Sequence, residues 1–351
     1  MTPGRTGSRG LSRWAYYVSS IPTLLSGMRP RGPLVRLFLG LPVRRPIDVT
    51  LSNGLRFRVA TPMDAWVLKE TCLDRDYEKD APLEPDWTVV DVGAAFGDFT
   101  VHAARLCPRG VVHAFEPLPE NFRRLEEHLR FNGVSNVRAS KEAIAAAPGS
   151  LTLYTVTGLT GQHRTAGDER GAAEPAIRVP ATTLDAAFRE RGIERCDLLK
   201  IDCEGAEFEI VLGLDPEVLS RIARIVLEYH DHVTEHTHEE LIRFLETHGF
   251  DVRVRPNPAW KELGFLYAEN RRHLNRRTDE QPLNPNRDER PLDHHPDEQP
   301  LNRHPEERSD EGSRPRFPDR ASIPGSLAAL RLTQRATPGR LVATFTSPRT
   351  R

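Results

Sequence analysis

The chain has 351 residues, and its 49 Lys and Arg against 50 Asp and Glu give a formal net charge of −1. This balance excludes a global positive field that would draw the whole protein onto nucleic acid, so we expect no nucleic-acid partner. Its four cysteines, Cys72, Cys107, Cys196 and Cys203, have no C-x-x-C spacing. That pattern favours reduced thiols in a cytoplasmic protein over a disulfide or zinc framework.

The first 46 residues form a basic, apolar leader. No Asp or Glu occurs before Asp48, and arginines flank the two apolar stretches Trp14–Leu25 and Leu34–Leu41. Neither stretch is long enough to span a bilayer, and no A-x-A-like cleavage site follows the first. We interpret residues 1–46 as helical or disordered, with peripheral contact to an anionic membrane surface as the alternative.

A hairpin and a short helix are predicted in residues 47–86. Ile47–Ala60 alternates apolar and polar residues around the turn Ser52-Asn53-Gly54, and Asp64–Leu73 follows as a short helix. We expect these elements to pack against the next domain. In residues 87–270, short apolar segments alternate with amphipathic helices, which predicts βαβ units and a mainly parallel sheet.

The remainder, residues 271–351, has a different character. Three consecutive nonapeptides from Asp279 begin DEQPLN, DERPLD and DEQPLN, and each contains one apolar residue among Pro and charged residues. Such units bury too little surface to offset the entropy of ordering them. We therefore predict a disordered tail without catalytic residues.

The strongest local signal is a glycine-bearing turn after a buried strand. Val89–Val92 is the strand, and the turn reads D-V-G-A-A-F-G over Asp91–Gly97. Small residues allow a ligand to approach the backbone, and the N–H groups of the next helix would face that ligand. We expect Asp91 to receive a cationic group of the ligand. The predicted cofactor-binding residues here are Asp91, Gly93, Ala94, Ala95, Phe96 and Gly97.

An acid at the end of the second strand completes this hypothesis. The strand Val111–Phe115 ends at Glu116, and Pro117 follows at the start of a helix. An ionised carboxylate there can accept both hydroxyls of a ribose, so Glu116 and Pro117 join the predicted site. Close packing of helix on sheet would explain the glycines but not Glu116. A nicotinamide enzyme is the rival, but the loop is not G-x-G-x-x-G.

These segments resemble the FkbM family of S-adenosylmethionine-dependent methyltransferases. The match rests on Asp91–Gly97, on A-F-E-P-L-P-E-N-F at Ala114–Phe122 and on D-L-L-K-I-D-C-E-G-A-E at Asp197–Glu207. It covers residues 47–270 and implies a doubly wound, Rossmann-like α/β fold with a seven-stranded, mostly parallel sheet whose last strand is antiparallel. S-adenosyl-L-methionine would lie at the carboxyl ends of the early strands. Family members often have Asn at the position of Ala95, so we expect weaker contacts to the methionine moiety.

Further acids at predicted strand ends are candidate site residues. Asp202 ends the strand Leu198–Ile201 and would face the same crevice as the first motif, and Glu204 follows it. Glu207 is explained equally well as an acid that complements a helix dipole. Glu142 follows the third strand, where this fold class contacts adenine, although a solvated charge explains it nearly as well.

Methyl transfer to a hydroxyl requires a group that removes the proton. His230 lies at the carboxyl edge of the predicted strand Ile225–Tyr229, so it is the first candidate base, ahead of Asp202 and Glu204. A partly exposed loop histidine is the alternative. The histidines at positions 230, 232, 236 and 238 match no tetrahedral ligand pattern, and we predict no metal.

The resemblance implies O-methylation of a hydroxyl on a sugar, glycan, glycolipid or secondary metabolite. An N-methyltransferase and a non-catalytic scaffold that binds the cofactor remain alternatives. We expect the acceptor near the loop after His230 and near residues 158–175, a Gly- and Thr-rich stretch predicted to be a mobile lid.

Overall fold

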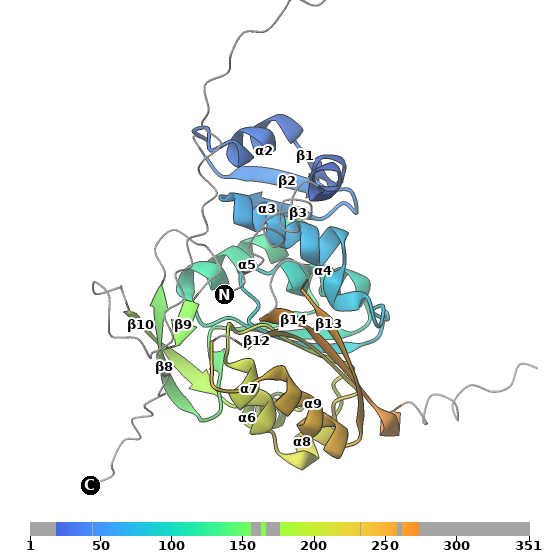
Figure 1. The fold of residues 1–351 in the computed structure, drawn as a ribbon. Coiled ribbons are helices and arrows are strands. Elements are labelled where there is room, and N and C mark those ends of the chain that lie inside the picture. Colours follow the sequence, from blue (N-terminus) through green and yellow to red (C-terminus); the bar gives the residue numbers. More distant parts are fainter. Residues whose placement is uncertain are drawn as a thin grey trace, which may run out of the picture. The chain divides into compact units, whose positions relative to one another are not determined.

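The computed structural model describes residues 19–43, 45–155, 163–165, 176–231, 233–257 and 262–273, all of which belong to one unit of the chain. A seven-stranded sheet runs through this unit (Figure 1). Its strands, in spatial order, are β13 (Phe250–Pro256), β14 (Leu263–Asn270), β12 (Arg224–His230), β11 (Leu198–Ile201), β4 (Thr88–Val92), β5 (Val111–Phe115) and β6 (Val137–Ser140). Only β14 pairs antiparallel, with both of its neighbours, so the predicted fold class is confirmed.

Helices cover both faces of this sheet (Figure 1). On one side lie α4 (Asp98–Leu106) and α5 (Pro119–Asn132), and on the other lie α6 (Leu184–Arg191), α7 (Glu207–Leu212), α8 (Pro216–Ser220) and α9 (His238–Thr247). All four residues of β11 are buried, as expected for a parallel strand with helices on both faces. The alternation of strands and helices predicted from the sequence corresponds to this sheet with helices on both faces.

The order of the strands creates a binding position. From β4 the chain moves outward through β5 to β6, and it later returns to β11 on the opposite side of β4. Crevices that bind ligands form where strand order reverses in this way, at the carboxyl ends of the strands. The loops after β4, β5 and β11 therefore meet at one edge.

A smaller antiparallel sheet precedes the seven-stranded sheet along the chain. It contains β1 (Met28–Arg29), β2 (Ile47–Leu51) and β3 (Arg56–Val59), which confirms the predicted hairpin and joins part of the leader to it. The helix α2 (Arg31–Phe38) lies between β1 and β2, and α3 (Pro62–Leu68) follows β3. Helix α3 begins two residues before the predicted start because Thr61 caps it. None of the described helices has the length and apolarity needed to cross a membrane.

A four-stranded sheet that the sequence did not predict flanks the main sheet. Its order is β7 (Ala143–Ile144), β10 (Ala176–Thr182), β8 (Gly149–Thr155) and β9 (His163–Thr165). Strand β9 falls within the predicted lid and pairs with β8, whereas the rest of residues 158–175 lies outside the described residues. The repeat tail and residues 1–18 also lie outside them.

Candidate active site

A pocket opens at the carboxyl ends of β4, β5 and β11, where the topology places a binding site. Its lining combines carboxylates and one amide with apolar side chains, some of them from the second sheet. The polar residues are Glu116, Asn121, Asp202 and Glu204. The apolar residues include Leu151 and Leu153 on β8, Phe115 and Ile144. The pocket therefore offers acceptors for hydroxyl and ammonium groups together with apolar surface.

Gly93 forms the turn at the bottom of this pocket. Its φ of 77° is left-handed, and a Cβ built on it would lie 1.9 Å from the carbonyl oxygen of Asp202. The Nζ of Lys200 donates a hydrogen bond to the Gly93 carbonyl over 2.9 Å. Only glycine fits this position, because a side chain would collide with the neighbouring backbone.

Glu116 joins the end of β5 to the loop after β4. Its Oε2 accepts the Ala95 N–H and its Oε1 accepts the Leu118 N–H, each over 2.8 Å. Burial raises the pKa of Glu116 to about 7, although these hydrogen bonds oppose the shift. The Asn121 side chain also donates a hydrogen bond to this carboxylate, so three of its four lone pairs are occupied and one remains to accept a hydroxyl of a ligand.

Asp91 does not reach the pocket wall. The side chain is fully buried, accepts a hydrogen bond from Thr100 Oγ1 over 2.5 Å and lies 3.1 Å from the Nζ of Lys200. Burial opposes the charge of Lys200, but Asp91 and Asp202 raise the pKa of that lysine above its ordinary value. The cation that Asp91 contacts in the structure is thus Lys200, and sequence reasoning assigned no role to this lysine.

The remaining predicted cofactor residues divide into two groups. Ala94 is buried and donates its N–H to the backbone of β5, while Phe96 packs in the core beside the N-terminal hairpin. Gly97 packs against α5, and Glu142 pairs with Arg191 at 3.4 Å. None of these four residues lines the pocket. The predicted residues that do line it are Gly93, Ala95, Glu116, Pro117, Asp202 and Glu204.

Asp202 occupies the rim between the pocket and the N-terminal segment. Tyr77, whose residue number lies 125 positions earlier, donates its hydroxyl to Asp202 Oδ2 over 2.9 Å. Lys200 Nζ lies 3.9 Å from the same oxygen. Tyr77, from a segment distant in sequence, and the nearby Lys200 therefore hold the Asp202 carboxylate in place, and no local motif revealed the contact with Tyr77.

His230 is a buried strand residue rather than a loop histidine, with 5% of its surface exposed. Its Nδ1 lies 3.0 Å from Glu207 Oε1, and its Nε2 lies 3.5 Å from Glu204 Oε2. Burial by itself would lower the pKa of His230, but Glu207, together with Glu204, raises it to about 10. The imidazole is therefore protonated at neutral pH in this arrangement and has no site for a further proton.

Glu207 does more than complement a helix dipole. Its carboxylate is fully buried, and Oε1 accepts the backbone N–H of His230 over 2.9 Å. Its Oε2 accepts the N–H of Gly205 over 2.7 Å. Glu207 thus holds the loop after β11 against the end of β12.

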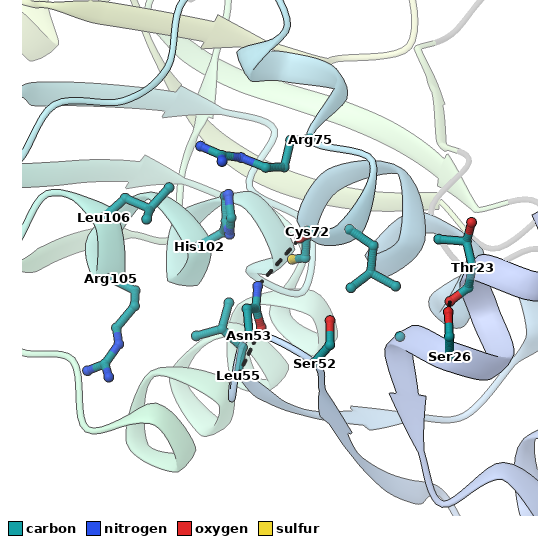
Figure 2. Close-up of a pocket in the computed structure, with 12 residues that line it drawn as sticks. Thr23, Ser26, Ser52, Asn53, Leu55, Cys72, Arg75, His102, Arg105 and Leu106 are labelled. Atoms are coloured by element: carbon teal, nitrogen blue, oxygen red, sulfur yellow. Dashed lines mark hydrogen bonds between the residues drawn. The ribbon is translucent and has the colours of Figure 1, made fainter. Parts of the chain in front are cut away.

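A larger cavity of 660 Å³ lies elsewhere, between the N-terminal segment and α4 (Figure 2). Figure 2 shows Asn53, Arg75, His102 and Arg105 around it. Both Arg75 and His102 pair with the buried Glu78. None of the residues predicted for the site lines this cavity, so volume does not identify the cofactor pocket.

Comparison with known proteins identifies the family of this chain. The model of the Methyltransferase FkbM domain matches residues 91–252. The 31-O-demethyl-FK506 methyltransferase FkbM of Streptomyces tacrolimicus is 30% identical over 60% of this chain and 91% of its own length. The chain belongs to the FkbM methyltransferase family.

Two further relatives extend this assignment. Methyltransferase 1 of Beauveria bassiana is 30% identical over 56% of this chain and 84% of its own length. The AMB antimetabolite synthetase AmbE of Pseudomonas aeruginosa is 34% identical over 60% of this chain, but this chain spans only 12% of AmbE. As an FkbM family member, the protein is an S-adenosylmethionine-dependent methyltransferase.

Proposed function

We propose that the protein binds S-adenosyl-L-methionine in the pocket at the ends of β4, β5 and β11 and methylates a hydroxyl of a small molecule or glycan. The observation that carries this proposal is Glu116, a buried acid that lines the pocket beside the Gly93 turn. The name of the Streptomyces relative, a 31-O-demethyl-FK506 methyltransferase, supports oxygen as the acceptor atom.

The cofactor would be held by its adenosine end. Glu116 accepts a ribose hydroxyl at its open lone pair, while Leu151 and Leu153 pack against the adenine. The backbone of Gly93 and Ala95 borders the methionine moiety, which directs the sulfonium toward Asp202. Bound S-adenosylmethionine supplies a methyl group that is already activated.

The protein must then align the acceptor oxygen with the methyl carbon and remove its proton. His230 carries a proton of its own, so we assign the acceptor's proton to Asp202 first and to Glu204 second. Tyr77 holds the carboxylate of Asp202 in position. The C–O bond forms as the C–S bond breaks, and the proton passes from the hydroxyl to the carboxylate.

This proposal is tested by Asp202→Asn. We expect S-adenosylmethionine affinity, measured by calorimetry, to stay within a few fold while turnover with a panel of hydroxyl acceptors falls roughly 100-fold or more. Asp251→Asn, which alters an exposed carboxylate paired with Arg271, is the matched control and should retain full turnover. Turnover at the wild-type rate in Asp202→Asn would show that Asp202 does not remove the acceptor's proton. A melting temperature raised by NADH and not by S-adenosylmethionine would favour a dehydrogenase.

We also propose that the leader contacts an anionic lipid surface. Among the described residues, the exposed large hydrophobic side chains all lie in the leader, at Ile21, Val35, Leu39 and Leu41. The exposed Arg31 and Arg36 lie beside them on α2. Apolar side chains next to arginines, with no acid nearby in sequence, suit the interface of an anionic bilayer.

A further inference from the structure

A group of metal-ligand side chains lies beside the cofactor pocket. One ligand atom each from Asp202, Glu228 and His230 lies within 4.8 Å of the other two. Three atoms at such separations can surround one cation at about 2.0–2.6 Å after a small contraction. Because Asp202 also lines the cofactor pocket, a cation there would lie next to the transferred methyl group.

The sheet topology brings this group together. Strands β11 and β12 are parallel, and Ile201 pairs with Leu227, so Asp202 continues beside Glu228. Glu228 and His230 are two positions apart on β12 and therefore lie on the same face of that strand. The sequence pattern predicted no metal because these ligands come from the loop after β11 and from β12 and form no local motif.

His230 has the orientation of a metal-binding histidine. Glu207 engages its Nδ1, so the Nε2 on the other side of the ring lies toward Glu204 at 3.5 Å. Histidines that ligate metals commonly donate their second ring nitrogen to a carboxylate, which fixes the ring and its tautomer. Glu207 supplies that carboxylate from a fully buried position.

The charges around the group favour a cation. Within the described residues, no hydrogen bond or ion pair joins the Glu228 carboxylate to a donor, and Asp202 and Glu204 add two more acids. Lys200 is the ammonium facing them, but it lies closer to Asp91, at 3.1 Å, than to Asp202, at 3.9 Å. A divalent ion would offset the remaining negative charge more fully than the single proton on His230.

We propose that Asp202, Glu228 and His230 bind one divalent cation that accepts mixed oxygen and nitrogen ligands, of the Mn²⁺ type. Its catalytic role rests on the proposed function. An acceptor hydroxyl oxygen would occupy an open position on the ion, which lowers the pKa of that hydroxyl. With Asp202 bound to the ion, the proton passes to Glu204, the second base of the proposed function, and the oxygen attacks the methyl carbon as the C–S bond breaks.

The test is a titration of the chelator-treated protein with Mn²⁺, followed by the electron paramagnetic resonance signal of the free ion. We expect one Mn²⁺ per chain in the wild type and an affinity lower by roughly tenfold or more in Glu228→Gln. Glu239→Gln is the matched control, since Glu239 belongs to a second acidic group with Asp231 and His238. Wild-type affinity in the control supports the proposed site. If Glu228→Gln does not fold, Asp202→Asn gives the same readout from a partly exposed position.

Two results would overturn the cation site: no Mn²⁺ binding by the wild type, or an affinity lost in Glu239→Gln and kept in Glu228→Gln. Calorimetry with S-adenosylmethionine on the same samples separates the two proposals. If the protein binds S-adenosylmethionine and turns over in the presence of a chelator, the cation site is contradicted and the proposed function is not. Mn²⁺ binding without cofactor binding contradicts the proposed function and leaves the cation site standing.

Discussion

The carboxylate of Glu116 accepts the Ala95 N–H over 2.8 Å, which couples the acid after β5 to the loop after β4. Because burial raises the pKa of Glu116 to about 7, this carboxyl is mostly protonated at pH 6 and mostly ionised at pH 8. Ribose hydroxyls donate to the ionised form. We therefore expect S-adenosylmethionine affinity, measured by calorimetry, to rise roughly tenfold from pH 6 to pH 8. The Glu116→Gln variant should bind S-adenosylmethionine more weakly and lose this pH dependence. A wild-type affinity that does not change between pH 6 and pH 8 would contradict the role of Glu116 in binding the ribose.

Ala95 itself is strained. Its φ of 45° is left-handed, a conformation that costs an alanine roughly 1 kcal/mol and that asparagine adopts more readily. We expect Ala95→Asn to increase the free energy of unfolding by about 0.5–1 kcal/mol in urea titrations. A decrease would show that the pocket has no room for the amide.

The parts of the fold and site that the sequence predicted are those encoded locally. The apolar run before Asp91 and the glycine turn after it predicted β4 and its loop, and the alternation in Ile47–Ala60 predicted the hairpin. In contrast, the inward orientation of Asp91 depends on Lys200, whose ammonium reaches it from the neighbouring strand. Contacts of this kind depend on which strands are neighbours, and no local pattern contains that information.

The apolar lining of the pocket could not be predicted from the sequence for the same reason. Leu151 and Leu153 alternate as strand residues should, but β8 has its place beside the pocket only through pairing with β10. Tyr77 is a similar case, because the contact with Asp202 joins two segments that no motif links. These tertiary contacts explain why the sequence indicated the acids that line the pocket, Glu116, Asp202 and Glu204, but not the residues around them.

Gly93 allows backbone strain to be separated from steric collision. Gly93→Ala adds a Cβ only 1.9 Å from the Asp202 carbonyl oxygen at a φ of 77°, so we expect a loss of about 3 kcal/mol or more in unfolding free energy. Gly133→Ala is the matched control, since its φ is 60° but nothing lies within 4 Å of the added Cβ. That variant should lose about 1 kcal/mol. Equal losses of unfolding free energy in Gly93→Ala and Gly133→Ala would show that the backbone around Gly93 moves enough to relieve the collision.

The pair of His230 and Glu207 should contribute strongly to stability. The pKa of His230 is raised from 6.5 to about 10, so its stabilisation is complete below pH 6.5 and is lost as the pH rises to 10. We expect Glu207→Gln to lower the unfolding free energy by about 3–5 kcal/mol at pH 7 and by less near pH 10. Glu240→Gln breaks the exposed pair with His236 and should change the free energy of unfolding by less than about 1 kcal/mol. Similar losses at pH 7 and pH 10 would contradict the charged pair.

The leader offers a test that is independent of catalysis. We expect the protein to sediment with vesicles of phosphatidylserine and phosphatidylcholine but not with phosphatidylcholine alone, because Arg31 and Arg36 need anionic headgroups. Added salt should weaken the binding, since the attraction is screened. Replacing the exposed Val35 and Leu39 with serine removes apolar surface that would insert into the bilayer, so the partition coefficient should fall roughly tenfold or more. Unchanged sedimentation of this double variant would mean that arginines alone hold the protein on the vesicle, and sedimentation with neutral vesicles would argue against the electrostatic attraction.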